Sequence, residues 1–536
     1  MVPFASKPSL KLTPLLRDGL IVLACLLADA LYLLLTRFAY HRFGYPLDDA
    51  WIYQTYARNL ARTGQWAFVP GLPSTGSTSI LWTLLLTPVY WLPIDPRWGT
   101  HALGLLTLIA AALGSARLFK EDSLRLSLAV GLSVALEWHL VWAGASGMET
   151  GLFAALLIWF WVWLRRHDPA RCAYRWHNSL LTGIWGGILM LARPEGVLAL
   201  GVAGLYGLLA PAGPTERVRL GRRFLWAVLA GAGFALFLVP FFAFNYAVSG
   251  AWWPNTFYAK QTEYAALYGQ SYLLRLFGQM SVGWIGAQVL LLPGLLAGLW
   301  IGVRRRTLDG AALAPLGWAL LHWALYAARL PVTYQHGRYA IPAIPLILIF
   351  GVRGMAHLIQ LRTERRLIRL GSLTWALSVA ALFPLMLGVL GAPAYARDVS
   401  FIEDEMVATA RWVNENVPHD AVVAAHDIGA LGYFAPRRLV DLAGLVSPDV
   451  IPFMRDANHL TAYILMSGAD YLIVFPHWSA EYEIIVSSPH FCPVWSAAQR
   501  EGYNSPTSLG PMTVYEVRPA GDCPLILPVQ AYLRLW

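Results

Sequence analysis

Long apolar stretches separated by short polar segments run through most of the chain. A helix that crosses a bilayer needs about 20 mostly apolar residues. This criterion predicts a first span over residues 18–37. Further spans are expected over residues 100–118, 126–143, 149–164, 178–193, 196–212, 223–243, 281–302, 311–328, 340–359 and 371–391. The pattern therefore predicts a polytopic α-helical membrane protein with about 11 transmembrane helices.

The basic residues between these stretches predict the orientation, because loops rich in Lys and Arg stay in the cytoplasm. Lys7, Lys11 and Arg17 precede the first span, so the N-terminus is expected on the cytoplasmic side of a bacterial inner membrane. If the later basic loops are cytoplasmic as well, residues 80–92 do not cross fully, and we predict a short interfacial or re-entrant helix there. The later basic residues are Arg117, Lys120, Arg125, Arg165, Arg166, Arg171, Arg175, Arg217, Arg219, Arg222, Arg223, Arg304, Arg305, Arg306, Arg362, Arg365, Arg366 and Arg369.

The outer loops of this topology carry most of the polar residues that are unusual for a membrane protein, so we expect the chemistry on the outer face. The first of them, residues 38–99, contains YPLDDAWIYQTYARNLARTGQWAFVPGLPSTGSTSILW. Residues 49–62 are predicted to form an amphipathic helix in the interface. The turn-rich VPGLPSTGSTS that follows excludes long regular structure. The other outer segments are residues 144–149, 193–196, 245–276, 329–339 and everything after about 392.

The composition changes at about residue 392. A helical pattern leads to Pro418, and strand-like segments follow at 421–427, 438–442, 470–475 and 512–518, with a short helix near 461–467. This alternation predicts a soluble extracytoplasmic α/β domain over residues 392–536, after a transmembrane domain over residues 1–391. Cys492 and Cys523 both lie in this tail, and the sequence leaves open whether they form a disulfide.

The overall composition supports a chain that lies mostly in lipid. Of its 536 residues, 57% are hydrophobic and 13% are charged, with a mean hydropathy of +0.51. Soluble domains carry about a quarter charged residues. The net charge of +9 comes from the short basic loops and does not indicate nucleic-acid binding. No HExxH, Walker A, GxSxG or paired CxxC motif occurs, which excludes zinc proteases, ATP-driven pumps and serine hydrolases of the usual kind.

The adjacent carboxylates Asp48 and Asp49 are the predicted catalytic residues. A carboxylate beside a bilayer is costly unless it is solvated, paired or functional. It can deprotonate an attacking hydroxyl, or hold a metal on a leaving phosphate. We name Asp49 as the candidate ligand of a divalent cation (Mg, Mn or Ca), a cofactor that the sequence does not establish. The alternative is that one aspartate caps the following helix, which would not explain both.

Three residues are candidates for binding a donor phosphate: Arg338, Lys260 and His336. A guanidinium at the outer start of a helix suits bidentate phosphate binding, and the alternative is an arginine that snorkels to the headgroups. Lys260 lies in WWPNTFYAK, among aromatic residues that stack on sugars or form an interfacial belt. His336 adjoins Arg338 and is the weakest of the three candidates.

The candidate substrate-binding residues are Asn255, Tyr258, Glu149, Arg193 and Glu195. The last two interrupt an apolar run at Arg-Pro-Glu, where a buried structural ion pair is the alternative reading. His426, Asp427 and Asp441 follow strand-like segments of the tail. We interpret these three as ordinary turn residues rather than as a ligand site.

Several of these motifs together resemble bacterial glycosyltransferases of the GT-C superfamily, in the arabinofuranosyltransferase-like and mannosyltransferase-like branch. The motifs are LDDAWIYQTYARNLARTGQWAFVPGLPSTGSTSILWTLLL, SGMETGLF, LARPEG, WPNTFYAK, RYAIPAIPL and DIGALGYF…VDLAGLVSPDV, which span nearly the whole chain. The family's first loop reads closer to FNPGE-x-x-x-G-x-T-S-P-LW. Val69, Leu72 and Ile80 replace its Asn, Glu and Pro, which leaves the identity of the sugar open.

The resemblance implies an inverting membrane glycosyltransferase that uses a polyprenyl-phosphate sugar as donor. The acceptor would be a glycan, lipid or protein of the cell envelope. The acidic motif of the family's first loop is matched here by Asp48 and Asp49, and by the family's pattern Asp48 is the expected base. A monomer in the lipid bilayer is expected, with no nucleic-acid partner. Two alternatives are a transporter or flippase of lipid-linked sugars and a non-catalytic protein of envelope assembly; the inverted repeats of many transporters are not evident.

Overall fold

The computed structural model describes residues 12–169, 175–209, 220–304, 310–360, 366–503 and 508–523. Part of the orientation argument rests on basic residues outside the described residues. These are Lys7, Lys11, Arg171, Arg217, Arg219, Arg305, Arg306, Arg362 and Arg365.

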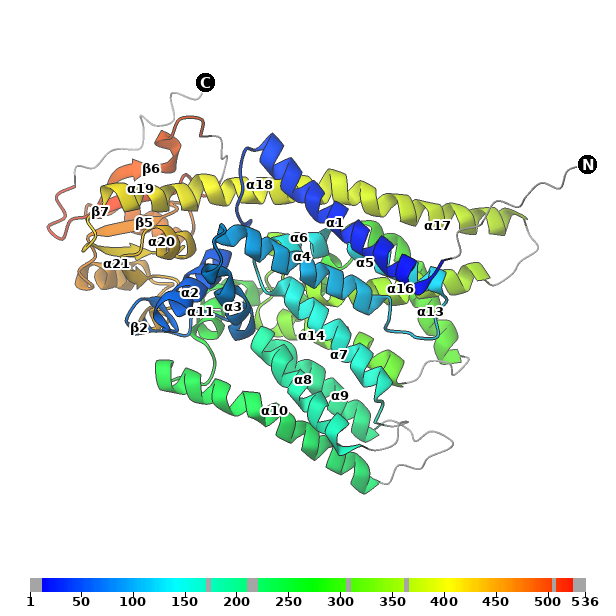
Figure 1. Ribbon diagram of the computed structural model, residues 1–536. Coiled ribbons are helices and arrows are strands. Elements are labelled where there is room, and N and C mark those ends of the chain that lie inside the picture. The colour runs from blue at the N-terminus through cyan, green and yellow to red at the C-terminus, as the bar shows by residue number, and fades with distance from the viewer. Residues whose placement is uncertain are drawn as a thin grey trace, which may run out of the picture.

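Helices form most of the chain up to residue 416 (Figure 1). The helices of the apolar region are α1 (Pro14–Ala39), α4 (Pro96–Ser115), α5 (Leu124–Ala135), α6 (Trp138–Ala145), α7 (Thr150–Arg166), α8 (Trp176–Ala192), α9 (Val197–Leu209), α10 (Leu220–Ser249), α12 (Tyr272–Val282), α13 (Leu292–Arg304), α14 (Gly310–Arg329), α16 (Ile344–Gln360), α17 (Arg366–Met386), α18 (Ala392–Ile402) and α19 (Ala408–Asn416).

Among the described residues, seven helical stretches are long and apolar enough to cross a membrane. The bent pair α5 and α6, which meet at 56°, makes up to eight if it counts as one span. The polytopic helical membrane fold predicted from the sequence is thereby confirmed. Three of the predicted spans correspond to the shorter helices α7, α8 and α9, which have 17, 17 and 13 residues.

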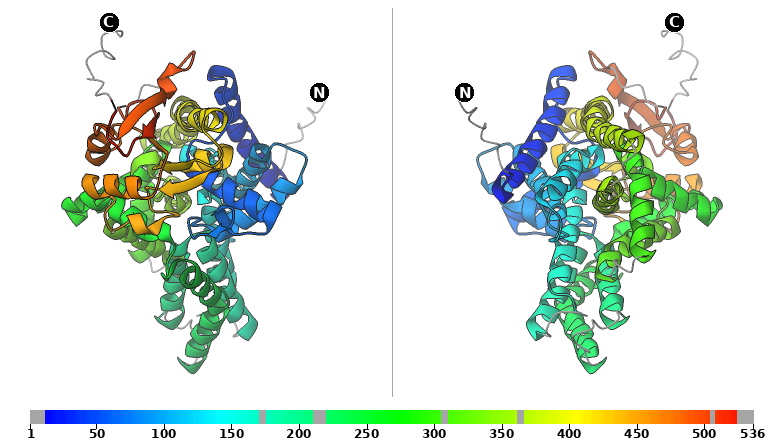
Figure 2. Two further views of the ribbon diagram at one scale, coloured as in Figure 1. Left: turned by 90° about the vertical axis from the view of Figure 1, so that its left-hand side faces the viewer. Right: turned by 90° about the vertical axis from the view of Figure 1, so that its right-hand side faces the viewer.

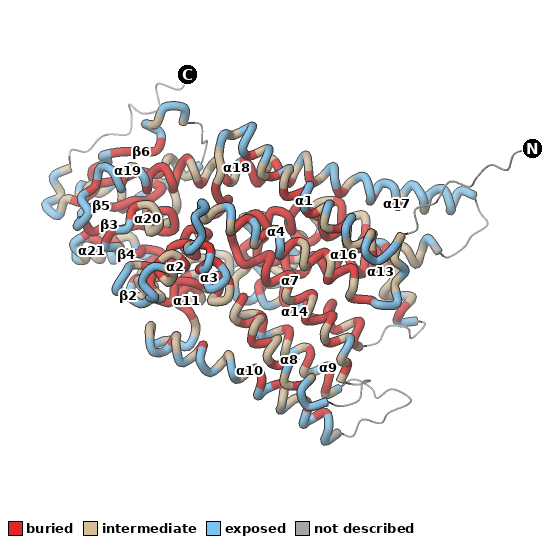
Figure 3. Tube along the Cα trace, in the orientation of Figure 1, coloured by how far each residue is buried: buried red, intermediate tan, exposed pale blue. Residues whose placement is uncertain are grey.

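The helices differ in how much of their surface the rest of the protein covers. α10 and α17 are exposed along much of their length (Figure 3), and their exposed side chains include Phe224, Leu236, Leu367 and Leu377. α16 lies in the middle, and most of the apolar window that contains it is buried. Exposed apolar side chains on outer helices indicate contact with lipid.

Two predicted spans have different bounds in the structure. The span expected over 281–302 starts later, because α12 ends at Val282 and Gly286 turns the backbone with φ 131° before the 3-10 helix η4 (Ala287–Leu291) and α13. The span expected over 371–391 does not end at 391. It continues through two π-helical turns, η6 (Leu387–Gly391) and η7 (Glu403–Val407), to Asn416 as one helical stretch. The expected start of the tail therefore lies inside a continuous helix.

The first loop forms a compact unit of its own. Its elements are α2 (Asp49–Thr63), the short antiparallel pair β1 (Ala67–Val69) and β2 (Leu72–Pro73), α3 (Ile80–Leu86) and the 3-10 helix η1 (Thr87–Trp91). A helix is confirmed where the amphipathic helix was predicted, although most of its residues, including Gln54, are buried; it ends at Gly64, which takes the left-handed conformation that favours glycine. α3 and η1 have 7 and 5 residues and are together too short to cross a bilayer, as the basic loops predict.

The tail contains a five-stranded mixed sheet of order β4-β3-β5-β7-β6. Strand β3 pairs in parallel with β4 and β5, and β7 pairs antiparallel with β5 and β6. Every strand predicted in the tail is present, but β6 was not predicted because Pro493 interrupts it. Cys492 and Cys523 are joined by a disulfide. The bounds are β3 (Val422–Ala425), β4 (Arg438–Asp441), β5 (Tyr471–Val474), β6 (Phe491–Ser496), β7 (Thr513–Val517), α20 (Gly429–Phe434), α21 (Ala457–Met466) and α22 (Ala480–Val486).

The first loop and the tail lie at the same end of the helical region (Figure 1). In the left view of Figure 2 the tail, in orange and red, and the first loop, in blue, are side by side. The N-terminal end of α1 and the beginning of α17 lie at the opposite end. The two longest segments that were expected on one face of the membrane therefore lie at one end of the molecule.

Candidate functional site

A cavity of about 360 Å³ lies where the first loop meets the membrane helices. We call it the central cavity. Its walls come from α2, from residues 253–261 with α11 (Asn255–Glu263), from the end of α14, from the start of α7 and from the break between α8 and α9. Its charged lining residues are Asp49, Glu149, Arg193, Glu195, Lys260, Arg329 and Arg338.

Asp49 lies at one end of the central cavity between two cations. Its Oδ2 accepts a hydrogen bond from Arg338 Nη2 at 2.6 Å, and Lys260 Nζ lies 3.4 Å from the same oxygen. Burial opposes ionisation, yet the charges of Lys260 and Arg338 lower the pKa of Asp49 well below its usual range. Asp49 in turn raises the pKa of Lys260, although burial works against that charge. All three groups are therefore ionised near neutral pH.

Arg338 has hydrogen-bonding capacity that the protein does not use. Besides Asp49, its Nη2 donates to the Tyr339 hydroxyl at 3.0 Å. Its Nε and Nη1 are buried and have no partner among the described residues. A strained turn precedes it, because Gln335 and His336 both have positive φ angles, of 53° and 56°. Backbone strain of this kind costs about 1–3 kcal/mol per residue and clusters at functional sites.

A second charged cluster lines the same cavity. Arg193 donates to Glu149 through Nη1, to Glu195 through Nε, and to the Tyr326 hydroxyl through Nη2 at 2.8 Å. The Tyr326 hydroxyl also bonds to Glu195. The Arg-Pro-Glu break produces this arrangement, because Arg193 leaves helix α8 in an extended conformation and Pro194 starts a 3-10 turn. The buried ion pair considered as the structural alternative is thus present, and it faces a cavity.

Tyr339 separates the two clusters. Its ring stacks on Tyr326, with centroids 5.2 Å apart, and the guanidinium groups of Arg193 and Arg338 lie 5.3 and 4.9 Å from its centre. Tyr53 also connects them, because it lies one helical turn beyond Asp49 on α2. Burial and the charge of Glu149 raise the pKa of Tyr53. The two clusters are therefore neighbours within one cavity.

Asp48 is placed differently from Asp49. Its Oδ2 and Oδ1 accept hydrogen bonds from the backbone N–H groups of Gly429 and Ala430, at 2.7 and 2.8 Å. It does not belong to the lining of the central cavity. Burial and the nearby Asp427 raise its pKa to about 7, against the lowering effect of the two amides. Asp48 thus caps a helix as considered from the sequence, but the helix is α20 of the tail and not its own.

Further contacts join α2 to the tail. At the other end of α20, Arg58 Nη1 and Nη2 donate to the carbonyl oxygens of Tyr433 and Gly432, at 2.5 and 3.0 Å. Trp51 packs on Tyr433 and Phe434, with ring centroids 4.8 and 4.7 Å away. We call the contact of Asp48, Trp51 and Arg58 with residues 429–434 the loop–tail seam.

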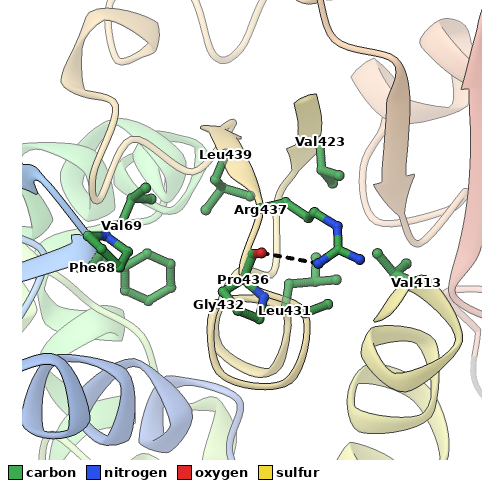
Figure 4. A pocket seen from close by; sticks show the side chains of 11 residues that line it. Phe68, Val69, Val413, Val423, Leu431, Gly432, Pro436, Arg437 and Leu439 are labelled. Atoms are coloured by element: carbon green, nitrogen blue, oxygen red, sulfur yellow. Dashed lines mark hydrogen bonds between the residues drawn. The ribbon is translucent and has the colours of Figure 1, made fainter. Parts of the chain in front are cut away.

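A small hollow lies beside the loop–tail seam (Figure 4). Phe68 and Val69 of the first loop face Leu431 and Gly432 across it. Its volume is about 10 Å³, which holds one water molecule at most. Arg437 on its far side is bound by backbone carbonyl oxygens, including that of Pro436 at 3.1 Å. The hollow therefore has no room for a substrate.

Three predicted binding residues do not line the central cavity. His336 Nε2 lies 2.7 Å from Asp398 Oδ2, and its ring packs against Trp142. The Asn255 side chain donates to the carbonyl of Leu445 at 3.3 Å, which ties α11 to the tail. Tyr258 contacts Phe257 edge to face.

The tail residues considered as turn residues are all paired. Asp441 accepts from the backbone N–H groups of Ala443 and Val446 at 2.9 and 2.7 Å, as a turn residue does. His426 lies 3.5 Å from Glu263 and 3.4 Å from Asp427. It therefore forms a charged contact between α11 and the tail.

The surroundings of Asp49 do not suit a divalent cation. Such an ion takes several oxygen ligands. The charged partners of Asp49 are instead Arg338 and Lys260. No group of three or more His, Cys, Asp or Glu side chains that could hold a metal occurs among the described residues. These contacts do not support the metal role suggested for Asp49.

Sequence reasoning missed Tyr326, which bonds to Arg193 and Glu195 in the second cluster, and Tyr339, which lies between the two clusters. Tyr326 lies in an ordinary apolar helix, and its one signal is Arg329, three residues later on the same face. Tyr339 follows Arg338 directly and belonged to the same motif. Neither position differs in sequence from an aromatic residue at a membrane interface.

Comparison with known proteins shows the fold of the chain. ArnT from Cupriavidus metallidurans, in a structure bound to undecaprenyl phosphate, is 14% identical with a TM-score of 0.56 over 93% of this chain and 98% of that one. The archaeal oligosaccharyltransferase AglB from Archaeoglobus fulgidus, in complex with an inhibitory peptide and a dolichol-phosphate, is 11% identical with a TM-score of 0.57 over 91% of this chain and 74% of that one. The chain therefore shares the fold of ArnT and of AglB, as the resemblance of its motifs led us to expect.

Matches at the level of sequence are few. The model of a family described as a domain of unknown function (DUF8728) matches residues 396–515, which lie in the end of the long helix and the tail. No curated protein matches the sequence.

Proposed function

We propose that this protein is a membrane glycosyltransferase that moves a sugar from a polyprenyl-phosphate donor to an acceptor of the cell envelope. The observation that carries the proposal is the end of the central cavity at Asp49. There a carboxylate is held between Lys260 and Arg338, and two buried nitrogens of Arg338 have no partner among the described residues. A phosphate oxygen supplies the acceptors that these nitrogens lack.

The apolar part of the central cavity supports a lipid-linked donor. Its apolar lining includes Trp253 and Phe257, together with Val197 and Leu325 of the membrane helices. Val197 and Leu325 are 39% and 37% exposed, although both belong to the cavity lining. A prenyl chain can therefore extend from the cavity to lipid while its phosphate stays at Arg338. Structures of the same fold hold undecaprenyl phosphate in ArnT and a dolichol-phosphate in AglB.

In the proposed reaction Asp49 acts as the general base. It accepts the proton of the acceptor hydroxyl while that oxygen forms a bond to the anomeric carbon of the donor. The bond from the anomeric carbon to the phosphate oxygen breaks, and polyprenyl phosphate leaves with the electron pair. Arg338 and Lys260 stabilise the charge that grows on the leaving phosphate. Direct displacement inverts the anomeric centre.

This assignment moves the base from Asp48, which the family's pattern favoured, to Asp49. Both oxygens of Asp48 are bound by backbone amides of the tail, whereas Asp49 lines the central cavity. The low pKa of Asp49 in the free protein is not an obstacle. A bound phosphate competes with Asp49 for Arg338 and Lys260, and weaker contact with these cations raises the pKa of Asp49.

We place the reaction on the outer face of a bacterial inner membrane. The N-terminus would then be cytoplasmic and the tail extracytoplasmic, as the basic loops indicate. The acceptor is a glycan, lipid or protein, and the tail beside α2 is the surface that would hold it. The sugar is a pentofuranose or a hexose, and the resemblance in the first loop does not decide between them.

The test is transfer from a panel of radiolabelled polyprenyl-phosphate sugars carrying arabinose, mannose, glucose or galactose. Membranes that contain the protein are compared with membranes that contain its Asp49→Asn variant. We expect label to move from one donor to an envelope acceptor with the wild type and not with the variant. Donor movement across sealed vesicles without transfer, unaffected by Asp49→Asn, would instead support the flippase.

A further inference from the structure

The second charged cluster of the central cavity has two carboxylates but only one guanidinium to neutralise them. Glu149 and Glu195 both bond to one guanidinium, that of Arg193. A buried ion pair is normally compensated, because an excess buried charge is costly. Glu149 is 2% exposed; its Oε2 has no hydrogen-bond partner within 3.5 Å among the described residues, and the Tyr53 hydroxyl is the other side-chain group that interacts with this carboxylate. This carboxylate oxygen can still accept a hydrogen bond.

The turn before α7 holds Glu149 in this place. Gly147 has a φ of 73°, and a Cβ there would lie 2.6 Å from the Tyr45 ring. Its carbonyl accepts a hydrogen bond from Trp82 Nε1 at 2.8 Å, which ties the turn to the first loop. Glu149 stands at the N-cap position of α7 but does not bond to the helix amides there. Its side chain bonds to Arg193 and lines the cavity instead.

The charges of the two clusters have opposite signs. Asp49, Lys260 and Arg338 together carry one net positive charge, and Glu149, Arg193 and Glu195 carry one net negative charge. The Tyr339 ring lies between them, with the guanidinium carbons of Arg338 and Arg193 4.9 and 5.3 Å from its centre. Both clusters line the same cavity, so a sugar whose phosphate lies at Arg338 extends along this cavity toward Glu149.

We propose that Glu149, supported by Arg193, Glu195 and Tyr326, selects the donor sugar by accepting a hydrogen bond from one of its hydroxyl groups. This inference rests on the proposed function and adds the class of sugar to it. The preferred donor carries a neutral, hydroxylated sugar, and a sugar with a carboxylate is rejected because it meets a net negative cluster. Arg193, Glu195 and Tyr326 act as positioning residues, since they bond to each other and hold Glu149 in place.

The test uses the donor that the panel identifies, together with its monodeoxy analogues, each lacking one hydroxyl. Steady-state kcat/KM is measured with the wild type, Glu149→Ala, Glu149→Gln and Glu137→Gln. Glu137 is the matched control, because it is equally buried but bonds to His139 and does not line the cavity. We expect one deoxy donor to lose roughly 10- to 100-fold with the wild type and with Glu137→Gln.

The same deoxy donor should lose no more than about threefold with Glu149→Ala, because its partner is already gone. Glu149→Gln keeps an acceptor oxygen and should show an intermediate penalty, and it should use the matching uronate donor better than the wild type does. An equal penalty for every deoxy donor in all four proteins would overturn the inference. If no donor is transferred at all, the proposed function itself fails, and the two failures are thus distinguished.

Discussion

The central cavity and the loop–tail seam both begin at the Asp48–Asp49 pair, and they differ in how far the hydrogen bonds of their charged groups are satisfied. At the seam, Asp48 and Arg58 bind the two ends of α20, the carboxylate at its amides and the guanidinium at its carbonyls. The helix dipole favours a negative charge at the N-terminal end of a helix and a positive charge at its C-terminal end, which is the arrangement found here. In the cavity, Arg338 and Glu149 keep buried atoms without a partner among the described residues. Charged groups whose hydrogen bonds are all formed stabilise the structure, whereas groups in a cavity wall that lack partners can bind a ligand.

The largest expected effect separates the two aspartates. Asp49→Asn should lower turnover about 1000-fold or more, because the base is lost, and it also lowers stability because Lys260 and Arg338 lose their shared carboxylate. Asp48→Asn should lower turnover by roughly tenfold or less, while the loss of one buried hydrogen bond costs about 1–3 kcal/mol of stability. Transfer assays and thermal melts of both variants in detergent measure the two effects. The reverse pattern would return the base to Asp48.

The next effect concerns the guanidinium of Arg338. Arg338→Lys should raise the donor KM by roughly 10- to 100-fold, because lysine keeps the charge but not the two free nitrogens. The control is Arg397→Lys, at an exposed arginine that bonds to a backbone carbonyl outside the cavity. Donor binding by the purified variants measures the difference. Equal affinity in all three proteins would mean that Arg338 serves only to hold Asp49.

The architecture was predictable where one local pattern decides it. Apolar runs, the amphipathic helix at 49–63 and four tail strands follow from periodicity alone. The long helix that ends at Asn416 was not predictable as one element, because its polarity changes at about residue 392 while its backbone continues. The polarity of a helical segment depends on its surroundings and does not show where the helix ends.

The sequence predicted which residues belong to the candidate site better than it predicted the role of each residue. Asp49, Lys260, Arg338, Glu149, Arg193 and Glu195 line one cavity as a group. The different surroundings of Asp48 and Asp49 could not be read from two identical neighbours, because the tail that binds Asp48 is about 380 residues away in the sequence. The surroundings of His336 and Asn255 could not be predicted for the same reason, because their partners Asp398 and Leu445 lie 62 and 190 residues away in the sequence.

A third prediction tests how tightly the loop–tail seam is packed. Gly429→Ala would bring a Cβ to 2.1 Å from the Asp48 carbonyl oxygen, so α20 must shift away from α2. We expect a loss of about 1–3 kcal/mol in stability from this overpacking. Gly231→Ala on α10 meets nothing within 4 Å and is the matched control. Limited proteolysis of the tail and thermal melts report the change, and equal behaviour of both variants would contradict the tight contact.

The smallest expected effect is a pH dependence at His426, which faces Glu263 of α11 and Asp427, with Asp441 and Tyr482 nearby. Burial opposes its charge, but the two carboxylates raise its pKa from 6.5 to about 10. A folded-state pKa above the unfolded value gives stability that is complete below pH 6.5 and is lost as the pH rises towards 10.

Between pH 7 and 8 the wild type should therefore lose up to about 1.4 kcal/mol more stability than His426→Gln, which has no such charge to lose. Melting temperatures of both proteins in the same buffers give this difference, and only the difference in slope is attributed to His426. Asp49 provides the contrast, because its low pKa leaves it ionised throughout this range. A change in pH from 7 to 8 should thus loosen the contact of α11 with the tail before it alters the charge at the cavity. Equal slopes of melting temperature against pH for the wild type and His426→Gln would show that His426 is not charged in the folded state.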